Sequence, residues 1–372
     1  MKRRIIAILW FVAVAASTLL WQRFTVVNRE FFGYFAATPD FVKEVLSGSI
    51  PLSTLAASFL VQLFYYPALG ALICACIVTG TYLAASFVFR SVPSGVPACI
   101  AAGACWIFTA VQDIPSAAVL ILLISCILCI PAAMIDRKTG KRSTGSIDTA
   151  ICVALVAAGI VYIAASPSLR EKEQWAKLEV SARNADWDTI LEVADRGATL
   201  RDSGKLPYAL LALNAKGQLH DRIAEYPVRE AGQLDMESIN SREAFYFNSL
   251  CYDLAGCFNE AMHMGFQTAT FLPHYMSLGL LRNIVRYSYN TGHRETTLKY
   301  CDILSKTLLG GAIAAKYRKL AQELPERYCF DGPDIPVKRH EQFSNLLILR
   351  ENGDSTTFVN DRIIGYLMTK QQ

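Results

Sequence analysis

The sequence lacks the short motifs that mark common enzyme chemistries. It contains no GxSxG turn, no P-loop and no GxGxxG stretch, so neither a hydrolase nucleophile nor a phosphate-binding loop is indicated. Histidine is rare, with 5 residues in 372, and no pair has the HxxxH spacing that places two metal ligands on one helix face. We therefore predict no catalytic residue, no metal site and no cofactor.

Charge is also scarce, and its scarcity is confined to one half of the chain. Residues 1–168 hold 11 Lys/Arg and 6 Asp/Glu, whereas residues 169–372 hold 25 and 26. With 53% hydrophobic residues overall, the chain is too apolar for an average soluble domain. No extended basic face is interleaved with aromatic residues, so nucleic acid is not an expected partner. The composition predicts a transmembrane region over residues 1–168 and a water-soluble region over residues 169–372.

Five apolar stretches in the first region are candidates to cross a bilayer, which takes about 20 apolar residues as a helix. They cover residues 5–21, 68–89, 92–111, 114–135 and 147–166. The first follows Lys2, Arg3 and Arg4, and a cleaved signal peptide is the alternative. Because this stretch stays apolar as far as Trp21, we favour a retained helix.

Residues 22–66 are predicted to form an external loop that ends in an interfacial helix. The apolar run at 52–66 would be only about 22 Å long as a helix, too short to span. It contains Tyr65 and Tyr66, which suit the depth of the lipid headgroups.

The positive-inside rule selects the topology. Five spans with a cytoplasmic N-terminus place all the cations of the short loops inside: Arg90, Arg137, Lys138, Lys141 and Arg142. A sixth span would move them outside. We therefore predict an integral membrane protein of the bacterial inner membrane, with residues 169–372 in the periplasm.

Three features of the first region invite a functional interpretation. Cys126 and Cys129 form a CxxC, but the external loop has no cysteine to exchange with, so apolar filling is favoured over redox chemistry. Asp113 is a candidate proton or ion site, although a solvated turn between two spans is the preferred interpretation. Glu30 and Asp40 lie in the first external loop, where glycosyltransferases with polyprenyl-linked donors keep a catalytic acid.

The second region shows amphipathic helical patterns of 10–18 residues with short turns. One stretch resembles a tetratricopeptide repeat, with helices predicted at 241–255 and 258–271. An aromatic, turn or small residue stands at each motif position: Phe245, Tyr252, Gly256, Phe258, Ala261 and the closing Pro273. Glycine permits the tight turn, alanine permits close helix approach and proline ends the second helix.

Weaker copies flank this unit. A second match is carried by Trp175, Leu178 and Trp187, and further turns occur at Gly217 and Gly292. The turn positions 185, 217, 256 and 292 are 32, 39 and 36 residues apart, close to the 34-residue tetratricopeptide period. We predict an all-α solenoid after the membrane helices, with a terminal cap from about residue 308. The alternative is a set of unrelated helix pairs.

The solenoid predicts a binding face and buried thiols. On the inner helices, Asn248, Arg282 and Arg286 are the candidate surface residues for a peptide or partner helix. Cys251 and Cys257 would be about 9 Å apart if both lay on one helix, too far for a disulfide, so we expect buried thiols.

Three segments together resemble a family of bacterial multi-pass membrane proteins with a tetratricopeptide-like C-terminal region, found in Bacteroides-type bacteria. They are QLFYYPALGAL from Gln62, LCYDLAGCFNEAMHMGFQ from Leu250 and NDRIIGYLMTKQQ from Asn360. The resemblance implies the same architecture and no particular reaction.

Two functional classes follow from this sequence. The favoured one is a non-enzymatic binding or scaffold protein, anchored in the bilayer, whose repeats hold a protein or peptide partner outside the cytoplasm. The alternative is a membrane enzyme of polyprenyl-linked sugar transfer with the repeats as an accessory domain. The alternative needs an acid in the first loop beside a lipid-lined cavity.

Overall fold

The computed structural model describes residues 2–91, 94–135, 146–195, 204–236, 240–325, 342–351 and 356–369. Every regular element in these ranges is helical, which confirms the all-α prediction. The chain forms two compact units, residues 1–176 and 177–372. Each is described by itself below.

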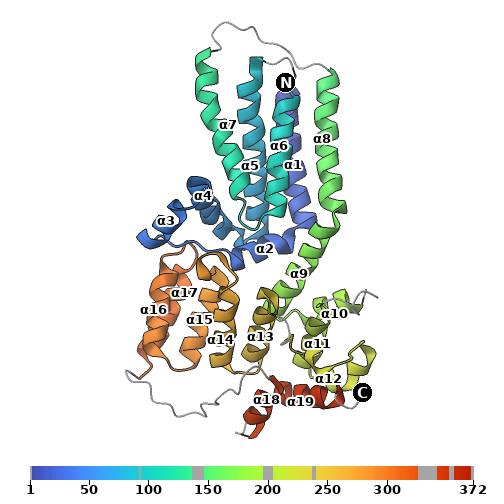
Figure 1. The fold of residues 1–372 in the computed structure, drawn as a ribbon, viewed down its shortest axis with the longest axis vertical. Coiled ribbons are helices and arrows are strands. Elements are labelled where there is room, and N and C mark those ends of the chain that lie inside the picture. The colour runs from blue at the N-terminus through green and yellow to red at the C-terminus, as the bar shows by residue number, and fades with distance from the viewer. Residues whose placement is uncertain are drawn as a thin grey trace. The chain divides into compact units, whose positions relative to one another are not determined.

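The first unit is a bundle of five helices that lie side by side (Figure 1). They are α1 (Lys2–Trp21), α5 (Pro67–Val88), α6 (Val96–Val111), α7 (Ser116–Ile135) and α8 (Ser146–Ala165). Small buried residues such as Ala75, Ala102 and Cys105 let the helices approach closely. Trp10 and Trp106 fill the centre, with ring centroids 5.7 Å apart and edge-to-face.

Three stretches of the described chain are helical, long and apolar enough to span a membrane: Arg3–Trp21, Pro67–Val88 and Ser116–Met134. The two other predicted spans, 92–111 and 147–166, differ. Helix α6 has 16 residues, about 24 Å, whereas a bilayer core is about 30 Å thick. Residues 149–165 of α8 and the helix α9 (Pro167–Arg183) qualify together as one broken span, with a bend of 52° between them. The count of five spans therefore stays a prediction.

The segment predicted as a loop over residues 22–50 contains two helices, which corrects that expectation. It forms α2 (Arg23–Phe32) and α3 (Pro39–Leu46), followed by α4 (Pro51–Val61) and the short η1 (Gln62–Tyr65). The Thr38 hydroxyl accepts a hydrogen bond from the Phe41 amide, and Pro39 occupies the first turn of α3. Threonine followed by proline is a sequence signal for a helix start.

The second unit is a succession of short helices. Beyond the end of α9 they are α10 (Trp187–Asp195), α11 (Leu206–Ala215), α12 (Leu219–Arg222), α13 (Arg242–Leu254), α14 (Phe258–Ala269), α15 (Leu278–Asn290), α16 (Arg294–Ser305), α17 (Gly311–Gln322), α18 (Gln342–Glu351) and α19 (Thr357–Thr369). Single 3-10 turns are η4 (Ile223–Glu225), η5 (Ala231–Gln233) and η6 (Pro273–Tyr275). From α13 to α17, each helix packs on the next one along the chain.

Four helix ends in this succession share one turn geometry. Ala185, Gly217, Gly256 and Gly292 have φ of +54°, +66°, +75° and +75°. After each, the next amide donates to the carbonyl five residues back at 2.9 Å, the pattern of a Schellman motif. The predicted turn positions therefore lie at helix ends that close in the same way.

Residues 241–305 show the repetition most directly. Ser241 and Ser277, 36 residues apart, cap α13 and α15 by accepting from the amide three residues on. Ala261 and Thr297, again 36 apart, are fully buried at corresponding positions of α14 and α16. Tyr252, Ala261, Met264 and Tyr287 form a buried cluster, with Phe245 and Phe258 packed against it.

The other predicted repeat residues are placed less uniformly. Leu178 is buried, whereas Trp175 and Trp187 are half-buried. Pro273 begins η6 after α14 has already ended at Ala269, so it follows the helix end instead of causing it.

The predicted cap from residue 308 is also arranged differently. Helix α17 continues the succession, but α18 and α19 pack together, and α19 packs on α11 and α12. A hydrogen bond from the Asn345 amide to the Tyr252 hydroxyl, 2.8 Å, joins α18 to α13. The last two helices therefore fasten the start of the second unit.

The turn geometry gives a matched test. An added Cβ would meet nothing within 4 Å at either Gly256 or Gly232, but only Gly256 has positive φ. We expect Gly256→Ala to destabilise α13–α14 by about 1 kcal/mol, because a residue with a Cβ is strained in the left-handed conformation. This loss should raise the amide exchange rates of residues 242–269 about fivefold. Gly232→Ala, the control, should leave that segment unchanged. Hydrogen exchange of the detergent-solubilised chain measures both, and equal effects would contradict the strain argument.

Candidate functional site

The predicted binding face is only partly a surface. Asn248 lies on α13 with 5% of its surface exposed, so its assignment to an exposed face was wrong. Arg282 and Arg286 lie on α15 and are half-buried. Arg286 donates from both terminal nitrogens to the Asp253 carboxylate, at 2.9 and 2.5 Å, and its guanidinium lies over the Tyr287 ring. Burial opposes the charge of Arg286, but Asp253 outweighs it and raises the pKa. Arg286 therefore ties α15 to α13.

The acidic candidates of the first region do not come together. Glu30, on α2, is 2% exposed, whereas Asp40 is exposed in the first turn of α3. Asp113 forms an ion pair with Lys172 and its side chain is 77% exposed, as expected of a solvated turn. Cys126 and Cys129 lie within α7 and do not form a disulfide, nor do Cys251 and Cys257. Cys251 is buried and Cys257 is half-buried.

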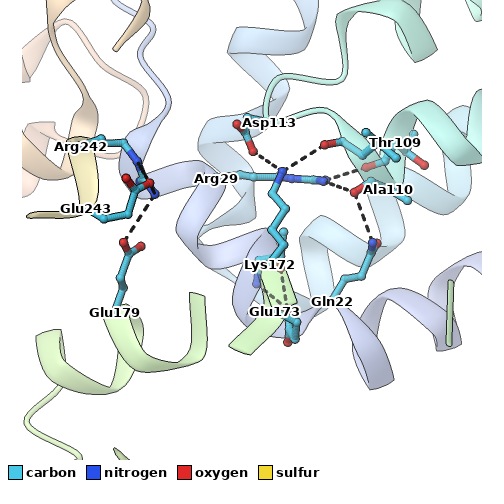
Figure 2. A network of polar contacts seen from close by, with 12 residues as sticks. Gln22, Arg29, Thr109, Ala110, Asp113, Lys172, Glu173, Glu179, Arg242 and Glu243 are labelled. Atoms are coloured by element: carbon cyan, nitrogen blue, oxygen red, sulfur yellow. Dashed lines mark hydrogen bonds and ion pairs between the residues drawn. The ribbon is translucent and has the colours of Figure 1, made fainter. Parts of the chain in front are cut away.

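A buried arginine that the sequence did not reveal organises one end of the bundle (Figure 2). Arg29, 4% exposed, extends from α2 and donates to the carbonyl oxygens of Thr109 and Ala110, both at 2.6 Å. The side-chain amide of Gln22 donates to the Ala110 carbonyl at 3.3 Å, and Lys172 donates to the Val111 carbonyl at 3.0 Å. Carbonyls in the last turn of a helix lack intrahelical donors and carry partial negative charge. The cations of α2 and α9 supply both donors and charge.

At the start of α2, a carboxylate accepts hydrogen bonds from backbone amides that lack intrahelical acceptors. Glu173, on α9, accepts from the amides of Phe24 and Thr25 at 2.9 and 2.8 Å, and from the Thr25 hydroxyl at 2.6 Å. The residue before α2, Gln22, provides no side-chain cap. Burial raises the pKa of the Glu173 carboxyl, while these hydrogen bonds and Arg29 act to lower it. Glu173 thus serves as the missing cap from about 150 residues away.

These contacts explain architecture more readily than chemistry. Each named charge of the Arg29 cluster contacts the backbone at a helix end, and Glu173 in addition accepts from the Thr25 hydroxyl. Among the described residues, no three His, Cys, Asp or Glu side chains converge as a metal site. We therefore assign the cluster a structural role, which is to hold α2, α6 and α9 together at one end of the bundle.

The contact of Glu173 can be tested by one isosteric change. Glu173→Gln keeps the size but removes the charge and turns an amide donor toward the α2 amides. We expect α2 to loosen by about 2 kcal/mol, the worth of charge-assisted hydrogen bonds, with a roughly thirtyfold faster exchange of residues 23–32. The control is Glu171→Gln, an exposed carboxylate of the same helix. Indistinguishable exchange in the two variants would exclude the capping role.

The second unit contains its own buried ion pair (Figure 2). Glu179 is fully buried and lies 3.5 Å from Arg242, which also donates to Glu243 at 2.7 Å. Burial raises the pKa of the adjacent Tyr246 to about 12. Arg183, one turn beyond Glu179, reaches the Tyr246 hydroxyl at 3.5 Å. The two contacts join α9 to α13.

A larger network surrounds the fully buried Arg362 in the NDRIIGYL segment. Its guanidinium donates to the Gln342 side chain at 2.9 Å, to the Leu234 carbonyl at 2.5 Å and to Asn214 at 3.4 Å. The Tyr366 hydroxyl donates to Asp235 at 2.6 Å. These bonds join α19 to α11, α18 and the segment before residue 237.

Two neighbours of Arg362 complete this attachment. The Asp361 carboxylate accepts from the amides of Leu219 and His220 at 2.9 Å, which caps α12. Its hydrogen bond with the His220 ring raises the pKa of that imidazole. A Cβ on Gly365 would lie 2.8 Å from the Leu219 side chain, so glycine permits the close approach.

An apolar groove opens between α3 and α4 in the first unit. Its volume is about 650 Å³, and its walls carry Phe35, Pro39 and Val42 on one side and Leu52, Leu55 and Phe59 on the other. Thr38 is the one lining side chain with a polar atom, and that hydroxyl caps α3. The exposed Asp40 directly follows the lining residue Pro39 along the chain.

The described parts thus define an all-helical protein with three candidate membrane spans, buried polar networks and one apolar groove. The chain belongs to the family of unknown function DUF6057, which matches residues 1–169 and 111–329. No curated protein and no solved structure matches the chain. The two matched ranges together cover residues 1–329, and the family description names no reaction. The NDRIIGYL segment lies beyond the matched residues.

Proposed function

We propose that the protein is a membrane-anchored, non-enzymatic binding or scaffold protein whose tetratricopeptide-like domain holds a protein or peptide partner outside the cytoplasm. The observation that carries this proposal is the 36-residue repetition of caps, turns and buried positions in residues 241–305. One helix pair cannot bury its apolar face alone, so such pairs stack and leave an extended concave surface. Partners of these surfaces are commonly extended peptides or helices.

The membrane location rests on the apolar bundle and on where its cations lie. Arg3 donates to the Ser86 carbonyl at 3.5 Å, and Arg90 donates to the Ala132 carbonyl at 3.0 Å. The start of α1 and the ends of α5 and α7 therefore share one end of the bundle, which carries these cations. Under the positive-inside rule this end is cytoplasmic, and five spans then place residues 169–372 in the periplasm.

Thiol labelling in cells tests this orientation. A reagent that cannot cross membranes should label a cysteine introduced at Gly204 and should not label one introduced at Gly140. The wild-type chain, with its 11 cysteines, sets the baseline. The reverse pattern would overturn the periplasmic assignment.

The partner surface is proposed to include Arg282 on the first helix of the second repeated pair. Of the three predicted face residues, Asn248 is buried and Arg286 binds Asp253, whereas Arg282 is half-buried on α15. A photo-cross-linking amino acid at Arg282 should capture one discrete protein partner in cells. The same group at Lys299, an exposed position of α16, is the control. Capture at both positions or at neither would contradict the proposal.

Polyprenyl-linked sugar transfer is retained as a second candidate because of one observation. It requires an acid beside a lipid-lined cavity, and Asp40 directly follows Pro39, a lining residue of the α3–α4 groove, along the chain. Buried Glu30 does not line that groove. Under this candidate, Asp40→Asn abolishes the protein's cellular activity at unchanged protein level. Under the scaffold proposal, Asp40→Asn is silent and Arg282 substitutions are not.

A further inference from the structure

We propose that the groove between α3 and α4 binds an acyl chain of a bilayer phospholipid. This inference rests on the membrane location in the proposed function and adds a lipid site to it. Three observations carry it, namely the chemistry of the lining, the support of the walls and the position of the groove on the bundle.

The side chains that line the groove favour a hydrocarbon ligand. Apart from Thr38, each lining side chain lacks a polar atom, and the Thr38 hydroxyl accepts the Phe41 amide of its own helix. A polar or charged ligand would lose its water shell there without replacement hydrogen bonds. A methylene chain has no hydrogen bonds to lose on entry, and the groove has a volume of about 650 Å³.

The walls are braced, so the groove exists without its ligand. Phe41 and Val45 are the buried residues of α3. Edge-to-face contacts join Phe35 to Phe41 at 5.5 Å and Phe35 to Phe59 at 5.4 Å. A further contact joins Tyr34 to Phe41 at 5.3 Å. Such aromatic pairs fix ring orientation, and α3 also packs on α4.

The position of the groove indicates which hydrocarbon is available. Helix α4 packs on α7, whose side chains Ile127 and Ile130 are 62% and 65% exposed on an apolar candidate span. Leu52 and Phe59 line the groove and are themselves exposed. Tyr65 and Tyr66, just after α4, are 50% and 58% exposed, typical of aromatics at headgroup depth. An acyl chain can therefore leave the bilayer surface of α7 and enter between α3 and α4.

The test uses the full chain in bilayer nanodiscs that contain a phospholipid with a photoactivatable acyl chain, and cross-links are mapped by mass spectrometry. We expect labelling within residues 35–59 and, as a bulk-lipid reference, on α7. Ala56→Trp fills the groove and should reduce labelling of residues 35–59 several-fold, because its indole occupies the space that an acyl chain would enter, without changing α7. Thr54→Trp, on the same helix but outside the lining, should change neither.

Each other outcome is decisive. Labelling of residues 35–59 that Ala56→Trp does not reduce would show bulk-lipid contact only, and would overturn the site. Labelling of α7 without residues 35–59 would show that acyl chains do not enter. Absence of both would refute the membrane location itself. Loss of the groove label on addition of a polyprenyl phosphate at a low mole fraction would replace the phospholipid by an isoprenoid ligand and favour sugar transfer.

Discussion

The backbone groups at helix ends are the constraint on which the described fold depends. Nineteen α-helices in the described ranges leave many amides and carbonyls without intrahelical partners. The chain satisfies them in two ways. In the second unit, four local turns with positive φ close their own helix ends. Distant side chains satisfy others, with Arg29 at the end of α6 and Glu173 at the start of α2 in the first unit, and Asp361 at the start of α12 in the second.

The distance along the chain between contacting residues determines which of these contacts the sequence alone could predict. A Schellman turn uses neighbouring residues, so Gly256 and Gly292 were visible as turn positions from spacing alone. Apolar length likewise indicated α1, α5 and α7. The bond of Arg29 to Thr109 crosses 80 residues, and that of Arg362 to Leu234 crosses 128. Without a set of related sequences, nothing local marks such pairs, so both buried arginines were missed.

The error at Asn248 has a local cause and could have been avoided. The residue 36 positions later is Ile284, which is 1% exposed on α15. An apolar residue at the corresponding place of the next repeat indicates a buried face, whatever the polarity of asparagine. Arg286 illustrates the complementary case. Its counterpart Leu250 is 7% exposed, and the arginine is accommodated there because Asp253 accepts both of its terminal nitrogens.

Buried arginine, rather than lysine, suits this use of charge. A guanidinium offers five donors in a fixed plane, so Arg362 reaches a side-chain amide, a backbone carbonyl and a second amide from three nitrogens. Removing such a group would leave several acceptors buried without donors, which costs far more than the net worth of each bond. Polar groups so committed to backbone are poor candidates for reactivity. The proposals made for this chain therefore draw on other features, namely the apolar α3–α4 groove and the half-buried Arg282 on α15.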